Sequence, residues 1–343
     1  MSVIAQIIDK LSHAAVYLSP SGAVLQVNAP ARDVFGLDLT GRHYLTVMRQ
    51  PDLVRAIETA LRTGSASRAS IQILAGHDSQ VFDVTCDPIE DQGGCVFVQL
   101  HDTTDQDQTI QMRRDFVANV SHELKTPLTA LNGFIETLQG PAKNDTAARD
   151  RFLSIMEQET DRMTRLVDDL LSLSKVERDQ KIRPTAQIDV GAVLGSVVNR
   201  LEPHAKNLEM PIRLTAPDTA VFCTADEDQI RQVFSNLIEN GLKYGRSARG
   251  LDVHLNFPVQ DVILKGGGMR VDFIDYGAGF DPIHIPRLGE RFYRIDGHRA
   301  RAVGGTGLGL AIVKHILKRH RGGLKISSKI GGGSIFSVYL PRV

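Results

Sequence analysis

The 343-residue sequence has little of three features that often define a protein class: cysteine, an excess of one charge, and long hydrophobic runs. Its 3 cysteines, Cys86, Cys95 and Cys223, are widely spaced and form no C-x-x-C pair. This spacing argues against a disulfide framework or a zinc site and favours a reducing compartment. Lys plus Arg (40) equals Asp plus Glu (40), so a nucleic-acid surface, which is usually strongly basic, is not expected.

No stretch of the sequence reaches the ~18 consecutive apolar residues of a membrane-spanning helix, so no membrane span is predicted. The N-terminus, MSVIAQIIDKLSHAAVYL, lacks the basic start and apolar core of a signal peptide. We therefore expect a cytoplasmic protein whose input signal arises in the cytoplasm or comes through a partner. A prior of roughly 100–200 residues per domain predicts two or three domains.

The first predicted domain, residues 1–103, alternates short strand-like runs with turn signals. Pro20-Ser21-Gly22 separates Ala14–Leu18 from Val24–Val27, which predicts a β-hairpin. Further strand-like runs occupy residues 71–74, 81–85 and 95–100, and residues 53–61 have helical spacing. These elements predict a small α+β domain, and the polar stretch 102–108 predicts a boundary or helical linker after it.

The second predicted domain, residues 104–180, carries apolar residues at helical spacing over 109–139 and 145–178. The sequence QGPAKN between these segments is a stop-and-restart signal. Two long amphipathic helices with a short loop predict an antiparallel hairpin. A lone hairpin leaves its apolar stripes half exposed, whereas two hairpins bury them in a four-helix bundle, so we expect a homodimer.

One helix of this hairpin places a histidine opposite its apolar stripe. At about 100° per residue, His122 lies on the far side of the helix and shares its face with Thr126. An isolated exposed histidine usually has no function, but here a carboxylate, Glu123, adjoins it. Neutral imidazole attacks phosphorus when a base takes its other proton, and Thr126 could position a water for hydrolysis. Pro127 predicts a kink. The stripe consists of Val117, Val120, Leu124, Leu128, Leu131, Ile135 and Leu138.

The third predicted domain, residues 181–343, mixes helices and strands and reads as an α/β sandwich in which helices cover a sheet. Helical spacing covers residues 190–208, 228–244 and 311–320. Strands are predicted at residues 212–214, 221–224, 253–257, 262–264, 271–275, 324–327 and 335–340. The glycine triplets 266–268 and 331–333 predict turns.

Two clusters in this domain suit metal-bound phosphates. Asn236, Asn240 and Lys243 share one side of a helix that ends at Tyr244. An amide oxygen is a hard ligand, so Asn240 is a candidate ligand of Mg²⁺, and Lys243 adds a point charge for phosphate. Separately, the run Gly304–Leu310 leads into a predicted helix, and backbone N–H groups at such a start suit phosphates.

Two further clusters could complete a nucleotide site. A strand ends at Asp275, whose carboxylate can accept the exocyclic amine of adenine, and Gly277 and Gly279 allow close approach of the backbone. The run Glu290–Arg294 combines aromatic and basic residues. Neither the complete G-x-G-x-x-G pattern nor the G-x-x-x-x-G-K-[ST] loop of P-loop proteins is present.

The run FVANVSHELKTPLTAL resembles the phosphoacceptor segment of two-component sensor histidine kinases. The four clusters resemble the N, G1, F and G2 boxes of the ATP domain of that family, whose fold is shared with gyrase, Hsp90 and MutL. Together the resemblance covers about residues 109–343. It implies that ATP and Mg²⁺ are cofactors, that His122 is phosphorylated on Nε2 with Glu123 as base, and that an aspartate of a response regulator receives the phosphoryl group.

The resemblance also implies a role for individual residues. Glu123 and Thr126 are associated with phosphatase action on the partner. The residues implied for nucleotide binding are Asn236, Asn240, Lys243, Tyr244, Asp275, Gly277, Gly279, Gly305, Thr306, Gly307, Leu308 and Gly309. One departure is Tyr276, where the family often has a small polar residue. The lid, residues 296–305, carries Arg299 and Arg301 and is expected to be mobile until ATP arrives.

The N-terminal strands, the Asn28 region and the exit Asp102-x-Thr104 resemble a PAS sensor domain. The order of domains most resembles the phosphate-regulon sensor kinase, from which the lack of transmembrane helices departs. A cofactor role is not expected for His13, His43 or His77. Two alternatives stay open: a PAS-driven dimeric scaffold that binds ATP without net kinase output, and a phosphatase-dominant enzyme.

Overall fold

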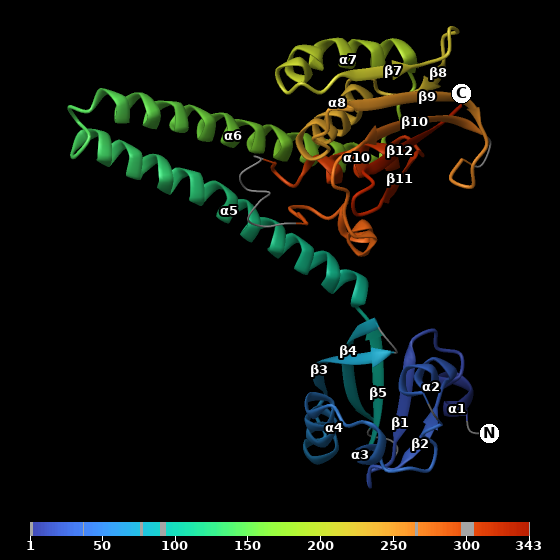
Figure 1. Ribbon diagram of the computed structural model, residues 1–343. Coiled ribbons are helices and arrows are strands. Elements are labelled where there is room, and N and C mark those ends of the chain that lie inside the picture. Colours follow the sequence, from blue (N-terminus) through green and yellow to red (C-terminus); the bar gives the residue numbers. More distant parts are fainter. Residues whose placement is uncertain are drawn as a thin grey trace. The chain divides into compact units, whose positions relative to one another are not determined.

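The computed structural model describes residues 3–36, 38–75, 78–89, 94–264, 267–295 and 305–342 (Figure 1). The chain divides into two compact units, residues 1–118 and residues 119–343. Residues 296–304 of the predicted mobile lid, with Arg299 and Arg301, lie outside the described residues, as does His77. In the described part of the chain, no helix has both the length and the apolar character needed to cross a membrane.

The first unit is built on a five-stranded sheet with the strand order β2-β1-β5-β4-β3. All of its strand pairs are antiparallel. The strands are β1 (Ala14–Leu18), β2 (Val24–Val27), β3 (Ser67–Ala75), β4 (Asp78–Ile89) and β5 (Cys95–Asp102). The predicted hairpin is confirmed, since Val16 of β1 faces Val27 of β2.

Four helices accompany this sheet: α1 (Val3–Ile8), α2 (Ala29–Phe35), α3 (Tyr44–Val47) and α4 (Pro51–Thr63). Helix α4 was predicted, and its Leu53 and Ile57 join the main core with Leu18 and Leu100 of the sheet. On the other face, Ile8 of α1 packs in a smaller cluster with sheet residues. Helices α1, α2 and α3 have at most seven residues each, which is too short for a helical period to show in the sequence.

Asn28 organises the start of this unit. Its side chain is fully buried, and its Oδ1 accepts hydrogen bonds from the backbone N–H groups of Ala15 and Ala31 at 3.0 and 3.1 Å. Its Nδ2 donates to the carbonyl oxygen of His13 at 2.8 Å. The same amide therefore caps α2 and ties it to β1. A buried amide whose bonds are all within the protein has a structural role.

The predicted helical hairpin is present as α5 (Thr104–Gln139) and α6 (Thr146–Arg178), joined by residues 140–145 (Figure 1). Helix α5 begins five residues before the predicted start, because Thr104 is held in place: its hydroxyl donates to Oδ1 of Asp102 and accepts from Val81 N–H. The helix continues through Pro127. Phe134 and Phe152 stack between the two helices with their ring centroids 5.3 Å apart.

The C-terminal part of the second unit contains a five-stranded sheet with the order β11-β12-β10-β9-β7. Its strands are β7 (Ile212–Thr215), β9 (Leu251–Val259), β10 (Gly268–Asp275), β11 (Gly323–Ser328) and β12 (Ser334–Pro341). Strands β7 and β9 are parallel and the other pairs are antiparallel. A separate two-stranded ladder joins β6 (Gln187–Asp189) to β8 (Phe222–Thr224).

Within the described residues, three helices pack on this sheet: α7 (Val190–Asn207), α8 (Glu227–Tyr244) and α10 (Gly309–Arg319). Phe234 of α8 and Phe273 of β10 are both fully buried and meet at 5.9 Å between ring centroids. The predicted α/β layers are therefore confirmed. One predicted strand, residues 262–264, is wrong: this segment is a turn, in which Oδ1 of Asp261 accepts from Ile263 N–H at 3.1 Å. An aspartate that bonds its own backbone two residues on favours a turn over a strand.

Candidate active site

The candidate phosphoacceptor, His122, lies exposed on α5. The hydroxyl of Thr126 donates to the carbonyl oxygen of His122 at 3.0 Å, so both residues lie on the same face of the helix. The following residue, Pro127, has no N–H to donate, and the carbonyl of Glu123 consequently loses its usual helical partner. The imidazole is thus open to a reacting group from solvent, beside a helical turn with incomplete backbone bonding.

Glu123, the predicted base, is held between the two helices. Its Oε2 accepts from Nη2 of Arg162 on α6 at 3.0 Å, and the two side chains are 33% and 18% exposed. Arg162 also lies 3.8 Å from Glu159 of α6. Carboxylate and guanidinium therefore form a partly buried pair that fixes Glu123 beside His122. To take a proton from the imidazole, Glu123 has to share or leave this partner.

The C-terminal half of α8 places the predicted metal and phosphate residues together. Nδ2 of Asn236 donates to the carbonyl oxygen of Gly309 at 3.2 Å, which ties α8 to the first residue of α10. Nζ of Lys243 lies 3.5 Å from Oε2 of Glu239. Asn240 is half-buried and, within the described residues, its side chain makes no hydrogen bond. Its amide oxygen is therefore available to an outside ligand.

The predicted glycine loop lies across from this face. Leu308 is fully buried and anchors the loop at the start of α10, while Gly307 has φ = +73°, which glycine adopts without strain. A Cβ on Gly305 would lie 2.4 Å from the hydroxyl of Tyr244, so the end of α8 and the loop touch here. The hydroxyl of Thr306 accepts from Leu308 N–H at 3.3 Å.

Basic and aromatic residues from the predicted third cluster support this loop. Phe292 N–H donates to the carbonyl of Gly307 at 2.9 Å, and Nη1 of Arg294 donates to the carbonyl of Gly305 at 2.7 Å. The other guanidinium nitrogens of Arg294, Nε and Nη2, are buried and have no hydrogen-bond partner among the described residues. Such donors are expected to find an acceptor, so Arg294 joins the candidate phosphate residues.

Asp275 lies at the end of β10, 7% exposed. Burial raises the pKa of its carboxyl, and hydrogen bonds from Gly277 and Ser334 oppose this rise. Its Oδ1 accepts from Gly277 N–H at 3.0 Å. The backbone of Gly245, just beyond α8, lies so close that an added Cβ would be 2.3 Å from Cβ of Asp275. The second predicted glycine, Gly279, has φ = +61° and contacts the carbonyl of Lys329 in the same way.

An unpredicted acidic residue enters the site from the hairpin. Oδ2 of Asp169 on α6 accepts from the hydroxyl of Thr306 at 2.6 Å. Burial raises the pKa of Asp169, the neighbouring Glu239 raises it further, and Thr306 and Lys243 oppose the rise. A carboxylate therefore occupies the position beside a hydroxyl and a lysine where the anionic part of a ligand would be expected.

Two more polar contacts join α6 to the same domain. The hydroxyl of Ser172 donates to Oε1 of Gln232 on α8 at 2.9 Å, and Glu177 pairs with Arg291. The structure thus brings the candidate nucleotide residues together but does not place them beside His122. On α6, Arg162 contacts Glu123, the neighbour of His122, and Asp169 follows Arg162 by seven residues. The Asp169–Thr306 contact therefore lies about 10 Å further along the helix axis, at 1.5 Å per residue.

Sequence reasoning missed three contributors to this site. Asp169 sits in an ordinary amphipathic helix and carries no local signal, because its partner Thr306 is 137 residues away. Arg294 was noted only as part of a basic and aromatic run. Gly245 lacks a motif, although a glycine that directly follows a helix is a signal for a helix end, and its contact with Asp275 depends on the fold.

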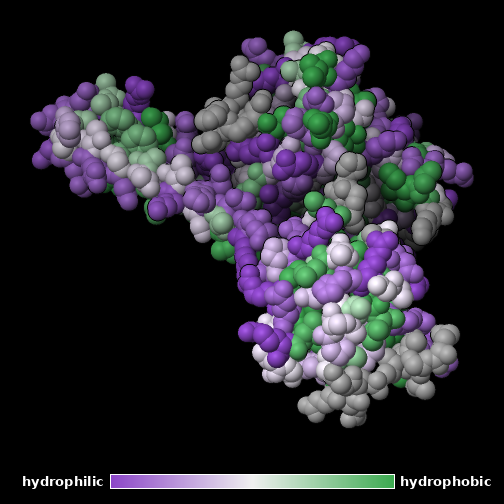
Figure 2. Space-filling view, turned by 90° about the horizontal axis from the view of Figure 1, so that it is seen from below, coloured by the Kyte–Doolittle hydropathy of each residue, from purple (hydrophilic) through white to green (hydrophobic). Residues whose placement is uncertain are grey.

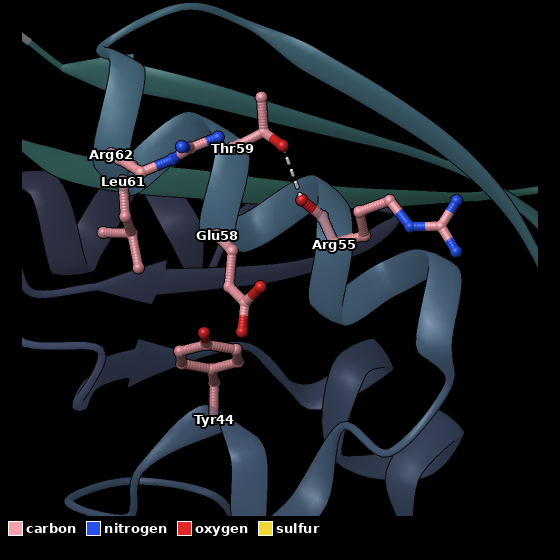
Figure 3. A pocket seen from close by; sticks show the side chains of 6 residues that line it. All are labelled: Tyr44, Arg55, Glu58, Thr59, Leu61 and Arg62. Carbon is pink, nitrogen blue, oxygen red and sulfur yellow. Dashed lines mark hydrogen bonds between the residues drawn. The ribbon is translucent and has the colours of Figure 1, made fainter.

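The N-terminal unit carries a shallow depression of about 430 Å³ between α3 and α4. Figure 3 shows that the Glu58 side chain extends toward the ring of Tyr44, with Arg55 and Arg62 at the two sides. The only hydrogen bond drawn joins the hydroxyl of Thr59 to the carbonyl of Arg55, at 2.8 Å. Its charges are mixed and its arginines exposed, so the depression does not define a ligand class.

Comparison with known families gives two matches. Residues 112–179 match the His Kinase A (phospho-acceptor) domain, and residues 225–343 match the histidine kinase-, DNA gyrase B- and HSP90-like ATPases. A sequence of the sensor protein kinase WalK of Staphylococcus aureus is 34% identical over 341 residues and is covered by this chain over 80% of its length. The chain belongs to the two-component sensor histidine kinases.

This histidine kinase spans only about half the length of other curated relatives. The WalK protein of Staphylococcus aureus strain Newman is also 34% identical over 341 residues, which are 98% of this chain and 54% of the relative. Among solved structures, histidine kinase ThkA, in a complex with the response regulator protein TrrA, matches with a TM-score of 0.53 and covers 98% of each chain. At 18% identity this match supports the fold alone.

Proposed function

We propose that this histidine kinase uses ATP to phosphorylate its own His122 and passes the phosphoryl group to an aspartate of a response regulator. The observation that carries the proposal is an exposed histidine on one helix of a hairpin whose other helix, α6, contacts a nucleotide domain. Because ATP is the substrate, we place this activity in the cytoplasm. The split into residues 1–103, 104–180 and 181–343 stays part of this proposal.

In the proposed reaction, Asp275 accepts the amine of adenine, and Lys243, Arg294 and the loop Gly305–Gly309 bind the phosphates. Nε2 of His122 attacks the γ-phosphorus, the bond from that phosphorus to the β,γ-bridging oxygen breaks, and ADP leaves. Glu123 holds or accepts the proton of the other ring nitrogen. Phosphoryl transfer of this kind depends mainly on positioning and on charge stabilisation, which the buried donors of Arg294 can provide.

The residues fit a role for Mg²⁺ beside the phosphates. Asn240 offers an amide oxygen that the described residues leave without a hydrogen bond, and Mg²⁺ is commonly held by one or two protein oxygens together with phosphates and waters. When bound, the ion neutralises phosphate charge. Asn236, in contrast, uses its Nδ2 on the Gly309 carbonyl, so we assign it the positioning of the glycine loop next to the metal and phosphates.

Transfer requires movement along α6. While Asp169 binds Thr306, the phosphate residues lie about two helical turns from the level of Glu123. The nucleotide domain has to leave this contact before the γ-phosphoryl group can reach His122. We infer that the described arrangement precedes the transfer step.

Finer parts of the function are also proposals. Thr126, on the same helical face as His122, could position a water that hydrolyses the phosphorylated regulator. The antiparallel sheet of the first unit and the Asp102–Thr104 bond at its exit support a PAS-like sensor domain. The likeness to phosphate-regulon sensor kinases stays a prediction.

Phosphotransfer to a regulator is tested with purified receiver domains from the same genome. Phosphorylated kinase, freed of ATP, is expected to lose its label to one receiver domain within seconds to minutes. The matched control is the same receiver with its acceptor aspartate changed to asparagine, which should take no label. Label that stays on the kinase with every receiver would contradict the proposed partner.

The apolar stripe of the hairpin is expected to form a homodimer. Val117, Leu128 and Ile135 of α5 are 61%, 51% and 40% exposed, and Figure 2 shows hydrophobic side chains gathered on the hairpin surface. We expect the Leu128→Glu variant to sediment mainly as a monomer at micromolar concentration, because the charge would be buried in the bundle. The neighbouring variant Thr129→Glu, on the opposite face, should stay dimeric. A native monomer at that concentration would refute the proposed bundle.

Asp169 is expected to weaken nucleotide binding at neutral pH. Its carboxylate binds Thr306 beside Lys243, so it competes with the phosphates and repels them. The Asp169→Asn variant should bind ADP about three- to tenfold more tightly, within the range of one typical hydrogen bond. Because burial raises the pKa of Asp169, it loses its charge at a higher pH than a free aspartate.

Lowering the pH into that range should therefore tighten ADP binding by the native chain more than by Asp169→Asn. The comparison of the two proteins removes the contribution of the titrating nucleotide itself. A matched control is Asp161→Asn, which makes the same change at an exposed position of α6 away from Asp169. Equal pH profiles in all three proteins would show that Asp169 does not compete with the nucleotide.

A further inference from the structure

Tyr276, which departs from the family pattern, directly follows Asp275, the candidate base-binding residue, and its side chain lies on the opposite face of the sheet. Side chains alternate along a strand, so Asp275 and its cross-strand partner Leu251 share the buried face of the sheet. Ile274 and its partner Asp252 share the opposite face. Tyr276 follows the same alternation and reaches Asp252 on the face of the sheet opposite to Asp275.

On that face, Tyr276 joins three segments of the chain. Its hydroxyl donates to Oδ2 of Asp252 on β9 at 2.5 Å. The other oxygen of Asp252 accepts from Nε of Arg213 on β7 at 2.6 Å, and the guanidinium of Arg249 lies 4.2 Å from the centre of the Tyr276 ring. Both hydrogen bonds lower the pKa of Asp252 against the effect of its burial, so the carboxylate is charged and accepts from both donors.

The third segment is the loop between α8 and β9, which carries both Arg249 and Gly245. Gly245 contacts Asp275 directly, and an added Cβ on Gly277 would lie 2.7 Å from Cα of Gly245. The N–H of Gly277 in turn holds Oδ1 of Asp275. Tyr276 therefore connects the turn 275–277, which orients Asp275, to strand β9 through Asp252 and to the α8–β9 loop through Arg249.

We propose that Tyr276 is a positioning residue for the nucleotide base: through Asp252 and Arg249 it fixes the turn 275–277 and so sets both nucleotide affinity and the preference for adenine over guanine. This inference rests on the proposed role of Asp275 as the base reader. We call the contacts of Tyr276 with Asp252 and Arg249 the Tyr276 tether. Without it, the turn 275–277 would become ordered only when the nucleotide binds, and the free-energy cost of that ordering would weaken nucleotide binding. An Asp275 side chain with more orientational freedom would also discriminate less between bases.

Two variants separate the contributions of the tether. Tyr276→Phe keeps the ring beneath Arg249 and removes the hydroxyl, and Tyr276→Ala removes both. The matched control is Tyr339→Phe, which removes the hydroxyl of a buried tyrosine on the same sheet; that tyrosine interacts with Arg270 and Asp261, away from the turn. A loss of nucleotide binding in the Tyr276 variants but not in Tyr339→Phe would thus come from the Tyr276 tether and not from a general loss of stability of the sheet.

The test is equilibrium titration of the full chain with ADP and with GDP, each with Mg²⁺, since neither nucleotide can be turned over. Tyr276→Phe should weaken ADP binding about two- to tenfold, the range of one hydrogen bond, and should weaken GDP binding less. Tyr276→Ala should add a further loss of about two- to fivefold from the cation–π contact. In autophosphorylation, KM for ATP should rise by a similar factor while the maximal rate stays within about twofold.

The measurements distinguish a failure of the positioning role of Tyr276 from a failure of the proposed role of Asp275 as base reader. If Asp275→Asn reduces the preference for ADP but both Tyr276 variants bind ADP and GDP like the native chain, the positioning role is wrong and the base reader stands. If Asp275→Asn leaves the preference unchanged, the base reader is wrong and the inference falls with it. A loss in Tyr339→Phe equal to that in Tyr276→Phe also overturns the inference, because the effect would then belong to the sheet as a whole.

Discussion

The His122→Gln variant is expected to lose autophosphorylation completely while it binds ADP as tightly as the native chain. His122 is exposed on α5 and is not one of the candidate nucleotide residues, so its replacement removes the proposed nucleophile without changing those residues. Glutamine has a similar size and polarity but no ring nitrogen that can attack phosphorus. Uptake of label from γ-labelled ATP measures the first property, and titration with ADP measures the second.

A matched control is His204→Gln, which makes the same change at another exposed histidine, on α7. That protein should be labelled like the native chain. If His122→Gln still takes up label, or if His204→Gln loses it, the phosphoacceptor has been assigned to the wrong residue.

The Asp275→Asn variant is expected to lose both affinity and base preference. A buried carboxylate can only accept hydrogen bonds: Asp275 accepts from Gly277 N–H and, in the proposed binding mode, from the amine of adenine. An amide would have to turn one donor toward a donor, and a buried group left unpaired costs about 1–3 kcal/mol. ATP binding should therefore weaken roughly 5- to 150-fold, with a smaller loss for GTP, whose carbonyl would face the carboxylate in the proposed binding mode.

Asp189→Asn is the matched control for this change. Asp189 lies in the same domain and caps α7 through Gly191 N–H at 3.0 Å, and asparagine caps a helix nearly as well as aspartate. This variant should bind ATP and GTP like the native chain. An unchanged ratio of ATP to GTP affinity in Asp275→Asn would show that another residue reads the base.

Periodicity in the sequence predicted the long helices because each of them buries one face and exposes the other to solvent. The hairpin α5–α6 and the helices α7, α8 and α10 all carry an apolar face over eleven or more residues. Short elements gave no such signal: α1 has six residues, α2 has seven and is capped by Asn28, and α3 has four and is capped by His43. The predicted strand at 262–264 shows the opposite error, since three apolar residues satisfied a strand pattern but Asp261 turns the chain.

Single clusters of the candidate site were predictable where their chemistry is local. Helical spacing grouped Asn240 and Lys243, and the end of a buried strand singled out Asp275, but only the family resemblance joined the clusters into one site. The contacts that depend on tertiary structure were not predictable. Asp169 on α6 meets Thr306, 137 residues later in the chain, and strand alternation directs Tyr276 to Asp252 on the face opposite to Asp275.

The central claim, that this chain is a kinase of its own His122, is tested most directly by the chemistry of the label that it acquires. The purified chain is incubated with γ-labelled ATP and Mg²⁺, and the labelled protein is then divided between acid and alkali. A phosphoramidate on His122 predicts label that is lost in acid, survives alkali and is found on the peptide that contains His122. Label that survives acid, or none at all from a chain that binds ATP, would contradict the claim.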